Sequence, residues 1–226
     1  MKKVLAIVAG IGLLVFAGGA SAAVVEKLPD LNNYGYYSNY ISPTTLAQQL
    51  VDDFAIASPV SLNSVTWWGE YQAGNPSSDY LVRFFLDTGG GIPEINWFAT
   101  ATVVSVTGTP TGSSNLTGPV YRYTASFSPM NFAPGPYWIS ILSIQDPANT
   151  NLFIWANSYG TATGGITYRN LDGNPWNVIY GGENERLRDN MAFALNYTPV
   201  PEPSMMMLLG GGLVGLVGYG RRRMKR

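Results

Sequence analysis

Short apolar stretches separated by glycine-, proline- and asparagine-rich turns fill the middle of the chain. In the clearest of them, residues 80–87, every second side chain is apolar or aromatic, which is the period of a β-strand with one face on a core. The residues expected to face that core are Tyr80, Val82, Phe84 and Leu86. Eight to nine such segments, with no convincing amphipathic helix, predict an all-β fold. We expect an antiparallel β-sandwich, jelly-roll-like, in which the first and last strands pair.

The remaining sequence is assigned around these strands. Arg83 and Asp87 should point to solvent or to a crossing edge, and residues 94–106 form a long β-branched run. We expect an irregular surface lead-in over residues 23–42, a glycine-, serine- and threonine-rich loop over 108–118, and a polar loop over 173–184. The expected strands lie within residues 46–56, 62–68, 80–87, 94–106, 121–127, 137–144, 152–156, 165–169 and 190–196.

Cysteine and histidine are both absent from the 226 residues. A domain without cysteine must be held together by packing rather than by disulfides, even if it is exported. Without histidine or cysteine, the usual zinc sites, Ser-His-Asp triads and Cys-His pairs are all excluded. We therefore expect no enzyme activity.

The first 22 residues predict a secretory signal peptide. Lys2 and Lys3 supply the positive start, and residues 4–16 supply an apolar stretch that is too short to span a bilayer. The small residues expected at the cleavage site are Ala20, Ser21 and Ala22, so the mature chain would begin at Ala23.

The last 27 residues, 200–226, have three parts in a fixed order. Val200 leads into the tripeptide Pro201-Glu202-Pro203, whose prolines keep the backbone extended and accessible to a processing enzyme. An apolar run over residues 205–219 can enter a bilayer as a transmembrane helix, although at about 1.5 Å per residue it is shorter than the hydrocarbon core. A cationic end then holds the far side in the cytoplasm, and its basic residues are Arg221, Arg222, Arg223, Lys225 and Arg226.

This order of tripeptide, apolar run and basic end resembles the tail of PEP-CTERM proteins. These are secreted bacterial proteins whose tail is read by a membrane enzyme called exosortase. The resemblance implies export across the inner membrane, a membrane-anchored precursor, and processing by exosortase near residues 201–203. It also implies a final location in the cell envelope or outside the cell. An ordinary C-terminal membrane anchor is the alternative.

Residues 23–199 are the expected exported domain, with 6 basic and 13 acidic residues and a net charge near −7. An acidic domain without a basic stripe argues against nucleic acid as a partner. Short motifs in this domain resemble a sandwich domain of many secreted bacterial proteins that has no assigned activity. Those motifs are residues 52–54, 67–71, 80–87, 137–141 and 189–193.

Carboxylates offer one candidate site. Asp52 and Asp53 are neighbours on a predicted strand, so they should point to opposite faces and cannot act as one acid–base pair. If the first and last strands pair, Asp52 or Asp53 would lie near Asp189, and oxygen ligands of this kind suit Ca²⁺. The chain has no contiguous calcium loop, so Ca²⁺ is the only cofactor to consider, and solvated surface acids are the alternative.

Aromatic rings offer the second candidate site. Adjacent Trp67 and Trp68 must face opposite sides of a strand, so one should be in the core and Trp68 could be exposed. Trp176 lies in the polar loop over residues 173–184 and is the best candidate for a ring that faces a ligand. Exposed rings could stack on sugars, whereas buried rings would simply fill the core.

Two functions remain open, and a third, a glycan-acting hydrolase, is the least expected because no catalytic pair of carboxylates can be named. The first is an exported, non-catalytic β-sandwich that is sorted to the envelope or matrix and, by its resemblance, is associated with exopolysaccharide or biofilm. The second is a carbohydrate-binding module that uses exposed tryptophan or tyrosine.

Overall fold

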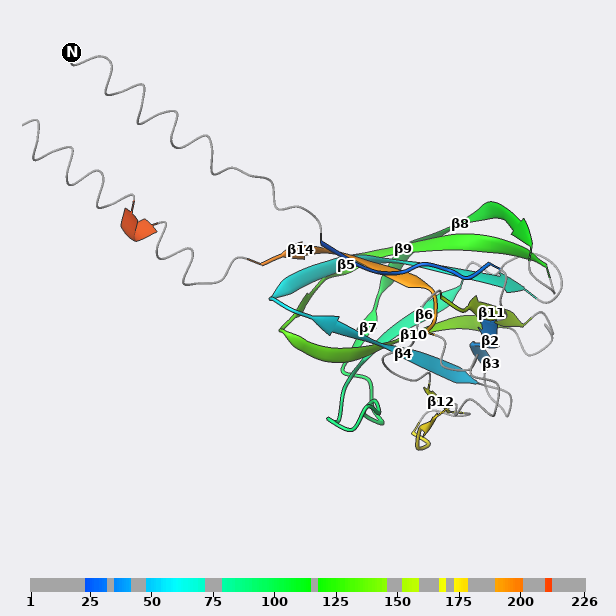
Figure 1. Cartoon of the computed structure of the whole chain (residues 1–226), viewed down its shortest axis with the longest axis horizontal. Coiled ribbons are helices and arrows are strands. Elements are labelled where there is room, and N and C mark those ends of the chain that lie inside the picture. The colour runs from blue at the N-terminus through cyan, green and yellow to red at the C-terminus, as the bar shows by residue number, and fades with distance from the viewer. Residues whose placement is uncertain are drawn as a thin grey trace, which may run out of the picture.

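The computed structural model describes residues 23–31, 35–41, 48–71, 79–114, 118–145, 152–158, 167–169, 173–178, 190–200 and 210–212. These residues form two β-sheets that pack face to face (Figure 1). Every pair of neighbouring strands is antiparallel except β10 and β3. The predicted all-β antiparallel sandwich is therefore confirmed.

The first sheet is centred on the long strand β5, Val60–Tyr71. One edge of β5 pairs with β9, Pro119–Phe132, which in turn pairs with β8, Val103–Ser114. The other edge pairs with β14, Phe193–Pro199, and further along with β11, Phe153–Ala156. Beyond them lie β1, Ala23–Lys27, beside β14, and β2, Gly35–Tyr37, beside β11.

The second sheet is centred on β10, Gly135–Gln145. Its neighbours are β4, Gln49–Ile56, and β6, Tyr80–Leu86, with β7, Ala99–Ala101, outside β6. On the far side of β4 follow β12, Thr167–Arg169, and β13, Asn177–Val178. The short strand β3, Asn39–Ile41, runs parallel to the end of β10.

Aromatic side chains dominate the core between the sheets. Trp67 stacks on Tyr123 with ring centroids 5.5 Å apart, and its edge contacts Tyr80 at 4.9 Å. Phe84 meets Phe132 edge-on at 5.1 Å. Ring pairs of this kind add about 0.5–1.5 kcal/mol each beyond the area that they bury, which suits a domain without disulfides.

The outer faces of both sheets also carry buried apolar clusters. Val51, Phe85 and Trp138 alternate with core residues along their strands and are covered by Trp176. On the outer face of the first sheet, the buried cluster consists of Trp68, Val120, Ala156, Ala192 and Ala194. Residues on the outer faces of both sheets are therefore buried as well, under Trp176 on the second sheet and beside Leu31 on the first, and alternation alone does not separate buried from exposed residues.

In strand β6, simple alternation predicts the burial of some side chains correctly and of others wrongly. Its predicted extent is confirmed to within one residue, and Tyr80, Val82 and Phe84 are buried as expected. Leu86, expected in the core, is 38% exposed. Arg83, expected toward solvent or a crossing edge, is buried because its guanidinium lies 3.9 Å above the ring centre of Trp97.

Two predicted irregular segments are strands instead. Residues 23–42, expected as a lead-in, contain β1, β2 and β3. Much of the expected loop over 108–118 belongs to β8, whose backbone pairs with β9 up to Ser114. Within the expected strand over 94–106, pairing begins only at Ala99, because residues 86–98 form a loop that is closed by backbone hydrogen bonds from Glu94 to Leu86 and from Phe98 to Phe84.

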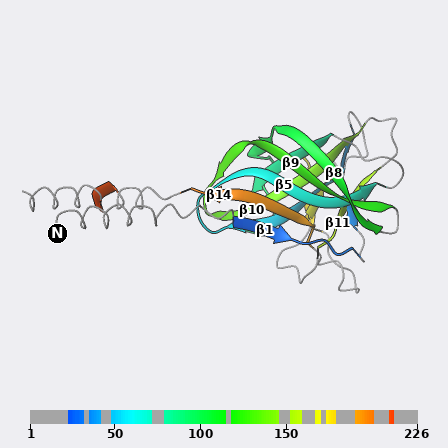
Figure 2. The same cartoon turned by 90° about the horizontal axis from the view of Figure 1, so that it is seen from above.

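The two chain ends of the domain lie side by side. The first described strand, β1, pairs with the last, β14 (Figure 2). The expected first strand, within residues 46–56, is β4, which lies in the opposite sheet, so its expected pairing with the last strand is wrong. Ala23 is opposite Tyr197, and Pro199 is opposite Val60. Both termini of residues 23–199 are therefore at one end of the sandwich, on the left of Figure 1.

Candidate functional site

The tail leaves the sandwich directly from β14. The backbone N–H of Val200 donates a hydrogen bond to Pro59 O at 2.8 Å, and the Val200 side chain is 40% exposed. The last described contact of the sandwich is therefore made by Val200, which directly precedes the tripeptide in the sequence.

Most of both targeting segments lies outside the described residues. This applies to Ala20-Ser21-Ala22, to Pro201-Glu202-Pro203 and to the basic residues from Arg221 onward, so these assignments remain predictions. Within the expected helix over 205–219, Gly210–Gly212 are helical and exposed. Among the described residues, no helix is long and apolar enough to cross a membrane.

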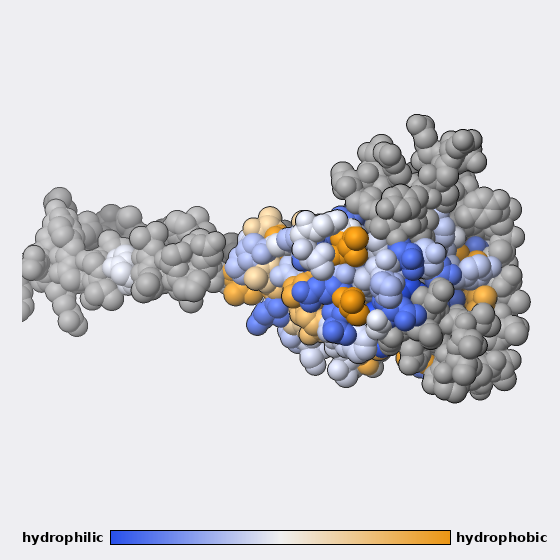
Figure 3. Space-filling model, turned by 90° about the horizontal axis from the view of Figure 1, so that it is seen from below, coloured by the Kyte–Doolittle hydropathy of each residue, from blue (hydrophilic) through white to orange (hydrophobic). Residues whose placement is uncertain are grey.

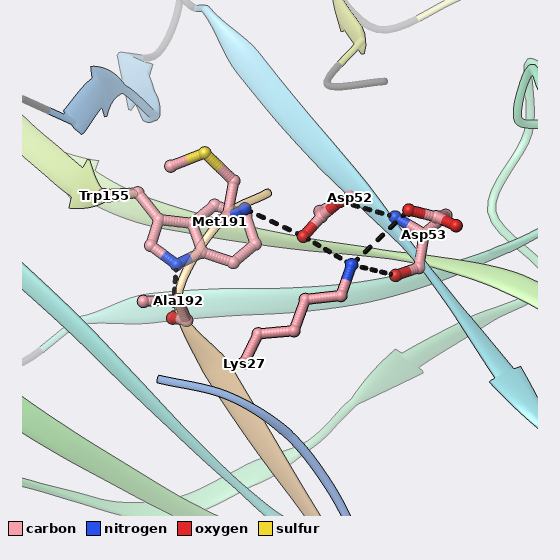
Figure 4. Close-up of polar contacts among 6 residues, drawn as sticks. All are labelled: Lys27, Asp52, Asp53, Trp155, Met191 and Ala192. Carbon is pink, nitrogen blue, oxygen red and sulfur yellow. Dashed lines mark hydrogen bonds and ion pairs between the residues drawn. The ribbon is translucent and has the colours of Figure 1, made fainter. Parts of the chain in front are cut away.

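A second group of functional interest joins β1 to β4 inside the sandwich. Lys27 Nζ lies 3.0 Å from Asp52 Oδ2 and 3.4 Å from Asp53 Oδ1, and it donates a hydrogen bond to Asp53 O at 2.6 Å (Figure 4). Asp52 also accepts two backbone hydrogen bonds, from Asp53 N to Oδ1 at 2.9 Å and from Met191 N to Oδ2 at 2.8 Å. Asp52 is thus held from three directions, by two strands and by the segment that precedes β14.

The surroundings of this group are apolar. The Asp52 side chain is fully buried, Lys27 is 18% exposed, and the Phe193 ring centre lies 5.2 Å from Lys27 Nζ. The indole of Trp155, also buried, donates to Ala192 O at 2.9 Å beside the cluster. Burial raises the pKa of Asp52 to about 7, and the Lys27 ammonium offsets this only in part. A carboxyl group of this kind exchanges its proton near neutral pH.

The predicted calcium site is only partly visible here. Asp52 does reach the segment that leads into β14, as expected, but Asp189 lies outside the described residues. The position that a cation would occupy between Asp52 and Asp53 is taken by the Lys27 ammonium. Among the described residues, no three acidic side chains gather closely enough to hold a metal ion. Calcium binding stays a prediction.

The two tryptophans proposed to face a ligand are buried. Trp68 is 7% exposed in the outer cluster of the first sheet. Trp176 is 9% exposed, because it packs edge-on against Phe85 at 5.2 Å, lies 4.4 Å from the Arg169 guanidinium and donates to Glu94 O at 2.9 Å. The expectation of exposed rings at these positions is corrected: loops cover the outer faces of the sheets.

An exposed tryptophan occurs elsewhere, in the loop over residues 86–98, which we call the apolar loop. Trp97 is 38% exposed, with the Arg83 guanidinium 3.9 Å from its ring centre. The other exposed hydrophobic residues of this loop are Leu86, Ile92, Ile95 and Phe98. Figure 3 shows the underside of the molecule, where hydrophobic residues are exposed beside hydrophilic ones. The sequence pattern alone did not single out Trp97, because its environment depends on how the loop folds back over β6.

These features define a class of protein. It is an all-β domain with both termini at one end, and its last strand is followed in the sequence by a tail that is expected to be cleaved by a processing enzyme. Residues 199–223 match the PEP-CTERM protein-sorting motif. The chain therefore carries a PEP-CTERM sorting signal, consistent with an exosortase substrate, and the motif indicates a secreted protein that is sorted to the cell envelope. No curated protein matches the chain.

Proposed function

We propose that the chain is a non-catalytic β-sandwich that exosortase processes at its tail and that then stays in the envelope or matrix, in association with exopolysaccharide. The observation that supports this most is the sorting motif at residues 199–223, which begins at the last residue of β14 and whose tripeptide follows Val200, the last described contact of the fold. A processing enzyme at the membrane could reach residues 201–203 without unfolding β14.

The contacts of two described acidic residues, Asp52 and Asp87, support a structural role for them. Asp52 is held by Lys27 and two backbone N–H groups, and Asp87 accepts a hydrogen bond from Trp138 Nε1 at 2.9 Å. Carboxylates that act on glycosidic bonds must face each other across a cleft at about 5–10 Å, with room for a sugar between them. The contacts of Asp52 and Asp87 are instead contacts within the domain.

Replacing Pro201, Glu202 and Pro203 together by alanine tests the processing step. In cells that have exosortase, we expect the wild-type chain to lose its tail, whereas the triple variant keeps it and stays with the membrane fraction. The matched control is Gly90→Ala, in a loop outside the motif at residues 199–223, where the added methyl group meets nothing closer than 3.9 Å. Equal processing of the triple variant and the wild type would contradict the proposal.

A second candidate function, glycan binding, is favoured by the exposed ring of Trp97. One side of the ring is fixed by Arg83, and a fixed and partly exposed ring is suited to stack on a sugar. If this is its role, matrix polysaccharide should quench the tryptophan fluorescence of the wild type, and Trp97→Ala should abolish the quenching. Tyr37→Ala, at an exposed ring on β2, serves as the control. Quenching that persists in Trp97→Ala would contradict this assignment.

A further inference from the structure

The contact between Lys27 and Asp52 involves additional polar groups beyond the two charged side chains. Each oxygen of the Asp52 carboxyl group receives a backbone N–H, from Asp53 on Oδ1 and from Met191 on Oδ2. A second carboxylate, Asp53, lies 3.4 Å from the same Lys27 nitrogen. An amine, a buried carboxyl group with a hydrogen-bond donor on each oxygen, and a neighbouring proton acceptor are the parts needed for acyl transfer.

We propose that Lys27 and Asp52 condense into an intramolecular amide, in which Lys27 Nζ is bonded to Asp52 Cγ. The bond would join β1 of the first sheet to β4 of the second, across 25 positions of sequence. In a domain without cysteine it would supply the covalent link between the sheets that disulfides provide in other exported proteins.

The reaction needs no reagent beyond the two side chains. Lys27 first passes one proton to Asp52 Oδ2, 3.0 Å away, which leaves a neutral amine and a neutral carboxyl group. The amine lone pair then attacks Cγ, and negative charge develops on Oδ1, where Asp53 N–H donates at 2.9 Å. Asp53 takes the second proton from the nitrogen and delivers it to Oδ2. The C–O bond breaks and one water molecule leaves, so that one N–C bond replaces one C–O bond and nothing is oxidised.

The apolar surroundings favour each stage. Because Asp52 is fully buried, its neutral acid form is less costly to reach than at the surface, and the uncharged amide product is favoured over a buried charge. The two reacting groups are held in contact by separate strands, so the reaction avoids the entropy cost of bringing them together. Phe193, whose ring centre is 5.2 Å from Lys27 Nζ, helps to keep water away from the nitrogen.

Tryptic peptide mapping of the denatured full chain tests the bond. The sequence contains no lysine or arginine between Lys27 and Arg83, so trypsin should cut an unmodified chain after Lys27 and release residues 28–83 as a separate peptide. The amide removes the charge that trypsin recognises. We expect one peptide that runs through Lys27 to Arg83 and is lighter by one water molecule.

Two results would overturn the proposal. One is recovery of residues 28–83 at full mass from the folded wild-type protein. The other is a peptide 28–83 that has lost water but was still cut after Lys27, which would indicate cyclisation of an aspartate alone. Both measurements use the wild type and do not depend on whether a variant folds.

Variants then assign the roles. Lys27→Arg keeps the positive charge but carries a guanidinium, so we expect full mass and normal cleavage after residue 27. Asp53→Asn keeps the size of the side chain and removes the proton acceptor, and it should slow amide formation at least about tenfold in refolded protein. Unchanged formation kinetics in Asp53→Asn would overturn the role given to Asp53.

Discussion

At the scale of single residues, Asp52 shows how burial gives a common side chain unusual properties. Asp53, its neighbour in sequence, is 32% exposed, whereas Asp52 is fully buried and has a pKa raised to about 7. The difference arises because successive residues of β4 face opposite sides, as predicted from strand geometry. Lys27 could not be predicted as the partner, because it lies 25 residues away with no local pattern that links the two.

The raised pKa of Asp52 predicts a pH dependence of stability. The groups that face it are Lys27, Asp53 and the Met191 N–H. In Lys27→Arg, Asp52 remains an acid, and burial raises its folded pKa above the usual 3.8, so the folded state binds the extra proton at pH values between the unfolded and the folded pKa. This contribution to stability is therefore fully present below about pH 4 and is lost as the pH rises through the folded pKa, which lowers the free energy of unfolding by about 1.4 kcal/mol for each unit of the pKa difference.

Urea unfolding of the wild type and of Lys27→Arg between pH 4 and pH 8 measures this effect. Other titrating groups contribute equally to both proteins, so the difference between the two curves isolates Asp52. In the wild type, the proposed amide would remove this carboxyl group, so we expect this contribution to be absent there. Parallel curves for the two proteins would contradict the account.

At the scale of elements, strands with strong alternation or aromatic content were predictable, and polar strands were not. Residues 80–87 are predicted as a strand almost to the residue, whereas residues 108–114 of β8 are predicted as a loop because their glycines, serines and threonines are typical of turns. Its pairing with β9 overrides that local preference. The strands β1–β3 were missed for a similar reason, since each is short and is defined by its partner strand rather than by its own pattern.

Of the candidate sites, the tail could be predicted from the sequence, whereas the exposure of the tryptophans could not. The tail could be recognised from its own order of residues, because it works as a linear segment. The exposure of Trp68, Trp97 and Trp176 could not, because it depends on which loops cover the outer faces of the sheets.

The close packing of strands also makes a prediction about glycine. In β5, a Cβ atom on Gly69 would lie 2.4 Å from the Phe153 ring and 2.6 Å from Ile154 O, because β11 pairs tightly at that point. Gly69→Ala should therefore lower the free energy of unfolding by about 2 kcal/mol or more. In Gly90→Ala, the new methyl group would meet nothing closer than 3.9 Å, so the free energy of unfolding of this variant should lie within about 0.5 kcal/mol of the wild-type value. Equal melting of the two variants would contradict the packing described.

At the scale of the whole molecule, the fold gathers both ends of residues 23–199 at one end of the sandwich. Ala23, the predicted start of the mature chain, pairs opposite Tyr197, and the sorting motif begins at residue 199. A domain built in this way can complete its fold while either end is held at a membrane.

The central claim is that the chain is handled as exported cargo whose tail is removed, and intact-mass measurement of the protein from exosortase-containing cells tests it most directly. The account predicts a chain that begins at Ala23, ends near residues 201–203 and lacks the apolar and basic segments. A mature chain that still ends at Arg226 would contradict it.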